Sequence, residues 1–370
     1  MQDDAGSAAP SRLRAVAIRL LSGDRPGSAI LSAVLALIVL GLALAPFVFP
    51  GSRSLETAAR LCIFIVLVAS YDLLIGYTGI VSFAHTMFFG IGAYGVAIAL
   101  RDLGPGWLAV GLGAVAGVAL AAGLAFVISL FSLRVRAIFF AMMTLAVASA
   151  FAILASQLSE LTGGEDGMSF RVPSQLTPAF RLFAEPILGV SISGRIVCYY
   201  AIFLASAALF LLMLRVVNSP FGRVLQAIRE NDFRAEALGY RTLFYRVTAS
   251  CLAAGIAALA GVMMALWLRY TGPDTTLSLT IMIDILLMVV IGGMGTLYGA
   301  VIGTTLFLLV QNYLQGLMAV AAEATLALPI LPRLLHPNRW LLWLGVLFVL
   351  SVYFFPNGIV GRLRQGSRRG

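Results

Sequence analysis

Long apolar runs separated by short polar segments make up most of this chain between residues 29 and 355. A helix needs about 20 apolar residues to cross roughly 30 Å of hydrocarbon. Because that hydrocarbon offers no water to backbone N–H and C=O groups, spans of this kind are expected to be helices. The pattern therefore predicts an all-α, polytopic transmembrane helix bundle. Ten candidate spans meet the criterion: 29–49, 58–75, 80–100, 107–131, 137–156, 195–217, 247–268, 279–293, 297–317 and 340–355.

Two neighbouring runs leave the number of spans open between eight and ten. The run 279–293 is short for a full crossing, and 297–317 follows it after only three residues. The pair is either two spans, a broken helix or a re-entrant pair. We favour ten spans, which place both termini on one side of the membrane.

Composition agrees with a membrane protein. The chain is 61% hydrophobic and 11% charged, whereas soluble domains average about 25% charged residues. The net charge of +9 comes from arginine alone, since the sequence contains no lysine. These arginines punctuate the apolar runs and form no patch, so we expect no nucleic-acid partner. The three cysteines all lie inside apolar runs, where buried, unpaired side chains are expected.

The arginines also predict the orientation of the chain. With a cytoplasmic N-terminus, 16 of the 25 arginines fall in cytoplasmic segments, which agrees with the positive-inside rule. We therefore expect a bacterial inner-membrane protein with both termini cytoplasmic. Its parts would be a cytoplasmic N-terminal segment (1–28), a transmembrane domain (29–355) with an external loop (157–194) and a cytoplasmic loop (218–246), and a cytoplasmic C-terminal tail (356–370).

No catalytic or metal-binding constellation is visible in the sequence. The two histidines, His85 and His336, have no ligand partners at a suitable spacing, and without lysine there is no phosphate-binding P-loop. We predict a non-enzymatic protein without metal or cofactor. If its transport is driven by ATP, a partner must hydrolyse the nucleotide.

The cytoplasmic loop contains a predicted short amphipathic helix. Ser219 can cap a helix whose first residue is Pro220, and Gly239 can end it or a following helix. Its apolar face would comprise Phe221, Val224, Leu225 and Ile228. From the pattern alone, such a helix either docks on a soluble ATPase or lies on lipid headgroups.

Glycines at four-residue spacing predict close helix packing. Gly295, Gly299 and Gly303 would share one helix face, and Gly113 and Gly117 another. Small residues at this spacing let helix backbones approach within a membrane.

Four motifs resemble one transporter family in order and position. They are Gly76-Tyr77-Thr78-Gly79-Ile80-Val81-Ser82-Phe83-Ala84-His85, Leu161–Gly167, Ser219–Tyr240 and Leu287–Leu297. Together they resemble the LivM-type permease subunit of branched-chain amino-acid ABC importers, over nearly the whole chain. Ala84 stands where glycine is usual, and Asp72 where asparagine is common. The latter leaves related solutes open as alternatives, namely urea, short amides and aromatic acids.

The resemblance implies a set of partners: two ABC ATPase subunits, a second, LivH-type permease and a periplasmic solute-binding protein, within membrane lipid. It assigns ATPase coupling to the 218–240 segment: Phe221, Gly222, Arg223, Leu225, Ala227, Ile228, Arg229, Glu230, Asn231, Glu236 and Gly239. In particular, we expect Phe221, Leu225 and Ile228 to insert into the ATPase, and Gly222 to permit its close approach. The outer loop Gly163-Gly164-Glu165-Asp166-Gly167 is either a turn or a contact for the binding protein.

Polar residues near two glycine breaks are candidates for the solute pathway. Paired broken segments at corresponding positions indicate a transport site, and Gly76–Gly79 and Gly292–Gly295 form such a pair. Each candidate residue either lines the pathway or serves helix packing. The candidates are Asp72, Tyr77, Thr78, Ser82, His85, Thr86 and Asp284.

Two other function classes remain open from sequence. A secondary transporter or channel would explain the spans, but it would leave the 219–240 motif without a role. A membrane enzyme would need a polar triad or a metal set, and the sequence displays neither.

Overall fold

The computed structural model describes residues 28–48, 51–132, 137–181, 191–324, 336–355 and 358–366. Each of the ten predicted spans corresponds to a helix of 14 to 28 residues, which confirms the all-α bundle. Within the described residues, nine helical segments are long and apolar enough to cross a membrane. The ten helices are α2 (Ala29–Val48), α3 (Ser52–Ile75), α4 (His85–Asp102), α5 (Trp107–Ser132), α6 (Ala137–Gln157), α8 (Gly194–Asn218), α11 (Thr242–Leu268), α13 (Leu279–Gly292), α14 (Leu297–Ala324) and α16 (Trp340–Phe354).

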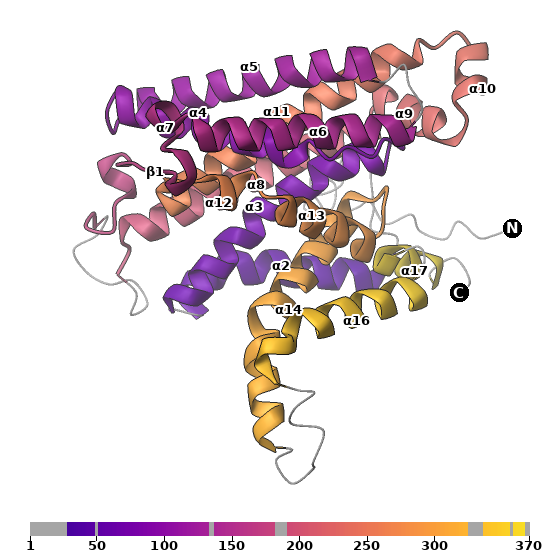
Figure 1. The fold of residues 1–370 in the computed structure, drawn as a ribbon. Helices are drawn as coiled ribbons and strands as arrows, with labels where there is room; N and C mark the ends of the chain where they lie inside the picture. The colour runs from indigo at the N-terminus through magenta and orange to yellow at the C-terminus, as the bar shows by residue number, and fades with distance from the viewer. Residues whose placement is uncertain are drawn as a thin grey trace, which may run out of the picture.

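Shorter elements lie at the two ends of the bundle (Figure 1). At one end are α9 (Pro220–Glu230), α10 (Asp232–Ala237) and α17 (Gly358–Gly366), and we call this end the α9 face. Towards the other end, the β1 face, lie α7 (Ser159–Thr162), β1 (Met168–Ser169) and α12 (Pro273–Thr276). The remaining short elements are η1 (Gly164–Asp166), η2 (Ser174–Leu176), β2 (Tyr270–Thr271) and η3 (Pro337–Arg339).

Helix α3 is the centre of the fold. Its span is 89% buried within the chain, and side chains from Ile63 to Leu74 pack on α8, α11, α13 and α14. By contrast, α5 and α6 expose large apolar side chains, such as Leu108 (76% exposed) and Ile138 (74% exposed). An apolar surface of this kind is stable against lipid or another apolar helix, not against water.

Glycines bring α4 into backbone contact with α5 and α11. A Cβ atom at Gly113 would lie 2.7 Å from the carbonyl oxygen of Gly95, and one at Gly117 would lie 3.1 Å from Cα of Gly92. On the opposite side, a methyl group at Gly261 would overlap the backbone of Phe89 in α4. The predicted seam at Gly113 and Gly117 is therefore confirmed.

The second predicted seam is correct for two of its three glycines. Gly299 and Gly303 of α14 pack directly on the backbone of α13 near Gly292. Gly295 does not share their helix face, because α14 begins at Leu297. Gly295 instead lies in a turn with φ of 83°, in the left-handed region that favours glycine.

Two predicted spans are shorter as helices than expected. The span predicted from residue 80 begins only at His85, and the residues from Gly79 to Ala84 are not helical. Helix α13 has 14 residues, which is about 21 Å of helix at 1.5 Å per residue. Helix α12 directly precedes α13, and the two together form one apolar segment long enough to cross a membrane. Helix α14 follows α13 and runs antiparallel to it. Both broken segments predicted from the sequence are thus present.

Candidate functional site

The two predicted helix breaks meet at the α9 face. The backbone N–H of Gly295 donates a hydrogen bond to Oδ1 of Asp72 at 2.8 Å, and Asp72 is 1% exposed. Nη1 of Arg229, on α9, donates a hydrogen bond to the backbone oxygen of Gly76. A Cβ atom at Gly295 would lie 2.7 Å from Nη1 of Arg229. We call Asp72, Gly76, Arg229 and Gly295 the Arg229 junction.

The Arg229 junction joins three parts of the chain that are remote in sequence. The carbonyl of Gly76 belongs to the last turn of α3, where helix C-termini leave oxygen atoms without intrahelical partners. A cationic donor at that position is favourable, because the helix dipole places partial negative charge there. Consequently α9 is tied to α3 and, through Asp72, to the turn between α13 and α14.

Helix α9 forms as its sequence predicts. Oγ of Ser219 accepts a hydrogen bond from the N–H of Gly222 at 3.4 Å, and Pro220 is the first helical residue. Asn231 ends α9 and caps α10, since its Oδ1 accepts a hydrogen bond from the N–H of Arg234 at 2.9 Å. Gly239 then follows α10 with φ of 89°.

The apolar face of α9 packs on this chain itself. The prediction that its apolar side chains insert into an ATPase is therefore wrong. Leu225 is 0% exposed and Ile228 is 1% exposed, and the half-buried Phe221 stacks on Tyr245 with ring centroids 5.6 Å apart. Gly222 is also buried. A methyl group there would overlap the backbone of Val217, so this glycine permits the turn from α8 into α9 and not the approach of a partner.

Other residues of this segment remain available on the surface. Arg223, Gln226, Ala227 and Glu230 are exposed on α9, as is Arg229, whose Nη1 bonds Gly76. Phe233 of α10 is 82% exposed. Glu236 is exposed too, but its Oε1 already accepts a hydrogen bond from Thr242 at 2.8 Å. We call Arg223, Gln226, Ala227, Glu230 and Phe233 the α9–α10 surface.

Most of the candidate pathway residues are buried or hydrogen-bonded within the chain. His85 is 0% exposed, and its Nε2 lies 2.8 Å from Oγ of Ser70. The hydroxyl of Thr78 donates to the carbonyl of Leu74 at 2.6 Å. Oγ of Ser82 accepts from the N–H of Ala84 at 3.3 Å, and Tyr77 is 4% exposed. The half-buried Asp284 of α13 forms a side-chain hydrogen bond with Gln311 of α14.

A polar groove of about 460 Å³ runs from the start of α4 towards the β1 face. Only Thr86 and Glu165 of the predicted residues line it. Five further polar residues in it, from α6 and the α12–α13 region, were not predicted: Ser149, Ser156, Gln157, Asp274 and Ser278. Serines within the apolar run 137–156 were the available signal in the sequence. The apolar lining is Phe83, Leu145, Ala148, Ala152, Ile153, Pro273, Leu277 and Leu279.

The outer glycine loop is built as a rigid turn beside this groove. Gly163, Gly164 and Gly167 have φ between 67° and 81°, and the hydroxyl of Tyr270 donates to the carbonyl of Asp166 at 2.8 Å. After the loop, Met168 pairs with Thr271 in the antiparallel β1–β2 ladder. Glu165 and Asp166 are exposed and acidic, so the loop presents negative charge at the β1 face.

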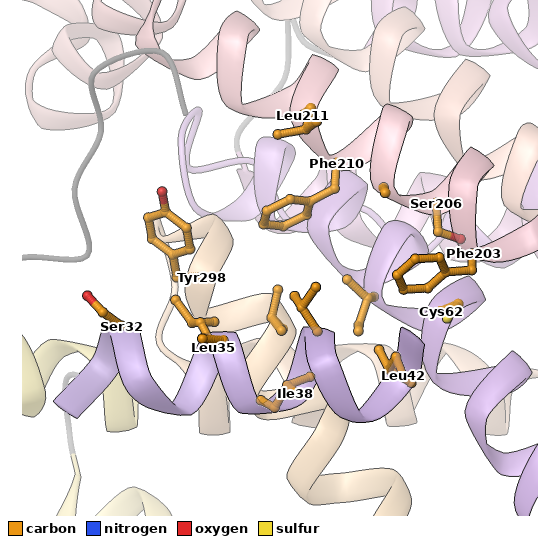
Figure 2. Close-up of a pocket in the computed structure, with 15 residues that line it drawn as sticks. Ser32, Leu35, Ile38, Leu42, Cys62, Phe203, Ser206, Phe210, Leu211 and Tyr298 are labelled. Carbon is orange, nitrogen blue, oxygen red and sulfur yellow. The ribbon is translucent and has the colours of Figure 1, made fainter. Parts of the chain in front are cut away.

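A second groove, of about 530 Å³, is almost wholly apolar. Figure 2 shows it between α2 and α8, lined by side chains such as Leu35, Ile38 and Phe210, with the hydroxyls of Ser32 and Tyr298 near one end. Its lining resembles the lipid-facing surface of the bundle. It therefore has no arrangement of polar groups that would bind a small polar solute.

Comparison with known proteins gives one consistent family. A family model described as the permease component of branched-chain amino acid transport systems matches residues 54–351. The high-affinity branched-chain amino acid transport system permease protein LivM of Salmonella typhimurium is 25% identical over 358 residues, which cover 91% of this chain and 78% of that protein. LivM of Escherichia coli is 24% identical over 363 residues, with the same coverage of both chains. A probable LivM of Methanocaldococcus jannaschii is 27% identical over 58% of each chain. No solved structure matches.

Proposed function

Because this chain belongs to the family of permease components of branched-chain amino acid transport systems, we propose that it is a membrane-spanning subunit of an ATP-driven importer for branched-chain amino acids. The observation that carries this proposal is the family match over residues 54–351, which contains the coupling helix as well as most of the spans. The chain itself acts as a non-catalytic subunit, and ATP is hydrolysed by separate subunits.

The proposed complex contains two ATPase subunits, a second permease of the LivH type and a periplasmic solute-binding protein. We assign the α9 face to the cytoplasm, with both termini on that side, and the β1 face to the periplasm. This orientation puts the α9–α10 surface where a soluble ATPase can reach it. It also puts the acidic loop around Glu165 and Asp166 where a binding protein can dock.

The proposed ATPase contact uses the exposed side of α9 rather than its apolar side. Arg223 and Glu230 supply charges, and Phe233 supplies an exposed aromatic anchor. Interfaces commonly combine such an apolar anchor with a polar rim. The buried residues Gly222, Leu225 and Ile228 support this contact by fixing α9 on the bundle, and Arg229 connects it to the interior.

The test is ATP hydrolysis and leucine uptake by the complete complex reconstituted in proteoliposomes. Ala227→Trp places a bulky side chain on the α9–α10 surface that would hold the ATPase away from α9. It should reduce binding-protein-stimulated ATP hydrolysis by at least tenfold, which corresponds to a loss of about 1.4 kcal/mol or more of docking free energy. Ala150→Trp is the matched control, because Ala150 is exposed on α6 away from α9. Full stimulation of the Ala227→Trp complex would contradict the docking assignment. Absence of ATP-dependent leucine uptake by the wild-type complex would contradict the function itself.

A further inference from the structure

The apolar groove between α2 and α8 is closed at one end by hydrogen bonds. At that end, the hydroxyl of Tyr199 on α8 donates to the backbone oxygen of Leu42 on α2 at 2.5 Å. This oxygen lacks its usual helical donor, because Pro46, four residues further on, has no N–H. The hydroxyl of Tyr200 makes a second bond of this kind, to the backbone oxygen of Ala43 at 2.9 Å. The two helices are thus tied together where the groove ends.

From this closed end the groove widens towards the α9 face. Figure 2 shows Phe203 of α8 close to Leu42, whereas Leu211, two turns further along α8, stands well away from α2. The lining on α2 runs from Ser32 to Leu42, which is about 15 Å at 1.5 Å per residue. One leaflet is half of a hydrocarbon core of about 30 Å and has the same depth. The groove is therefore as long as the acyl chains of one leaflet, and it opens at the level of their headgroups.

The walls of the groove favour an apolar occupant. Aliphatic and aromatic side chains line most of it, and none of the described lining residues is charged. A buried water molecule needs two to four polar partners, and the apolar walls do not supply them. Apolar walls without partner atoms also lose dispersion contacts, which an apolar chain in the groove restores.

Two arginines lie at the open end of the groove. Cζ of Arg364, on α17, lies 5.7 Å from the ring centroid of Tyr298, a lining residue. On α8, Arg215 follows the lining residue Leu211 by four positions, so it shares the groove side of that helix one turn nearer to the α9 face. Arg215 is exposed, and it forms no hydrogen bond or ion pair with any residue that the structure describes. Because helical side chains lean towards the N-terminus of their helix, Arg215 is directed back towards the groove.

This open end complements an anionic headgroup. Helix α17 packs on the starts of α2 and α14, so Arg364 and the hydroxyls of Ser32 and Tyr298 lie at the same end. Guanidinium groups and hydroxyls are donors to phosphate oxygens. The α9 face is cytoplasmic in the orientation given above, and basic pockets between membrane helices on that side bind the headgroups of anionic lipids.

We propose that the apolar groove is a binding site for an anionic phospholipid of the cytoplasmic leaflet, with one acyl chain between α2 and α8 and the phosphate at Arg215 and Arg364. The site goes beyond the proposed function, because its ligand is a lipid that stays in the membrane and not the transported solute. It uses the orientation given above and is independent of the solute that the complex carries. The bound chain joins α2 to α8 at the end that the bonds of Tyr199 and Tyr200 do not reach.

The first experiment locates the lipid by photo-cross-linking. The complete complex is reconstituted in phosphatidylcholine vesicles that contain a trace of phosphatidylglycerol with a photoreactive group in the middle of one acyl chain. Illumination should label this chain within the lining segments 32–42 or 203–211. Photoreactive phosphatidylcholine with the same acyl chains should label these segments about fivefold less or weaker still, since each arginine near a membrane surface contributes about this factor. Equal labelling by the two lipids, or labelling only elsewhere, would overturn the proposal.

The second experiment tests the groove and its open end separately. Ala207→Trp fills the groove and should abolish the labelling, whereas Ala205→Trp, at an exposed position on the other side of α8, should not. Arg215→Gln should lower labelling by phosphatidylglycerol about fivefold and leave labelling by phosphatidylcholine unchanged. Arg234→Gln removes the same charge from an exposed position on α10 and is the control. Equal labelling in Ala207→Trp and the wild type, or equal effects of the two arginine variants, would contradict the site.

The same preparations distinguish a lipid from the second permease subunit as the occupant. If that subunit covers the groove, Ala207→Trp should release it from the purified complex and the wild-type groove should not be labelled, which would overturn the proposal. Failure of the proposed function has a different result. A wild-type complex that takes up no amino acid but is labelled in the groove by phosphatidylglycerol would contradict the importer and leave the lipid site standing.

Discussion

Arg229, on the surface helix α9, donates a hydrogen bond to the backbone oxygen of Gly76 at the end of the buried helix α3. At the same junction, Oδ1 of Asp72 accepts a hydrogen bond from the N–H of Gly295 at 2.8 Å. We therefore expect a movement of α9 to reach α3, and the turn between α13 and α14, through these two hydrogen bonds.

We predict that Arg229→Met separates ATP hydrolysis from transport. The residues of the α9–α10 surface are all retained in this variant, so the ATPase subunits should still bind. Loss of a charged hydrogen bond of roughly 1.5–3 kcal/mol should lower leucine uptake per ATP hydrolysed about tenfold. Parallel assays of uptake and phosphate release in proteoliposomes measure this ratio. Arg241→Met, at another exposed arginine, is the control, and an unchanged ratio in Arg229→Met would show that the junction does not transmit movement.

Substitutions at Asp72 distinguish a bonding role from a pathway role. Asp72→Asn keeps an acceptor oxygen for the N–H of Gly295, so stability and uptake should stay close to those of the wild type. Asp72→Leu leaves the N–H of the half-buried Gly295 without this acceptor and should lower the free energy of unfolding by about 1 kcal/mol. Thermal unfolding of the purified chain and leucine uptake are the measurements. A stable Asp72→Asn variant with strongly reduced uptake would indicate that the carboxylate acts on the solute.

Gly295 should not tolerate a side chain. Gly295→Ala places a Cβ atom 2.7 Å from Nη1 of Arg229 at a φ of 83°, and residues held in such a conformation are disfavoured by about 1–3 kcal/mol. We expect a lower melting temperature in detergent. Gly123→Ala is the matched control, since nothing lies within 4 Å of a Cβ atom there, and its melting temperature should not fall. Equal melting temperatures for the two variants would contradict the close packing of the junction.

The orientation in the membrane predicts a pattern of labelling. Ser159→Cys and Ser191→Cys, both exposed near the β1 face, should react with a membrane-impermeant thiol reagent added from the periplasmic side. Gln226→Cys, exposed on α9, should react only after the inner membrane is permeabilised. The reverse pattern would invert the proposed topology. A chain without its three native cysteines supplies the background.

Local signals in the sequence predicted the helices and their caps. Ser219 and Pro220 begin α9, and the glycines at positions 113 and 117 pack α5 on α4, as their sequence spacing indicates. These features depend on residues close together in the chain, and on the need for every lipid-exposed backbone group to bond within its own helix. The breaks at Gly76–Gly79 and Gly292–Gly295 were visible for the same reason.

The face that each residue presents could not be predicted in this way. An apolar stripe on α9 is the same pattern whether it covers an ATPase or the chain's own core, and only the tertiary structure shows that Leu225 and Ile228 face inward. Likewise, the sequence places Asp72 and Arg229 157 residues apart, and their role at one junction follows from packing alone.

The sequence by itself determined that most of this chain lies in lipid, that it is helical, which family motifs it carries and where its helices break. These features could be predicted because the length of apolar runs and the spacing of glycines act locally. The tertiary structure decided which polar residues share a groove, which are bonded within the core and how α9 is connected to the helix ends. Those relationships arise from contacts between segments distant in the chain, where side-chain type allows several partners and packing selects one.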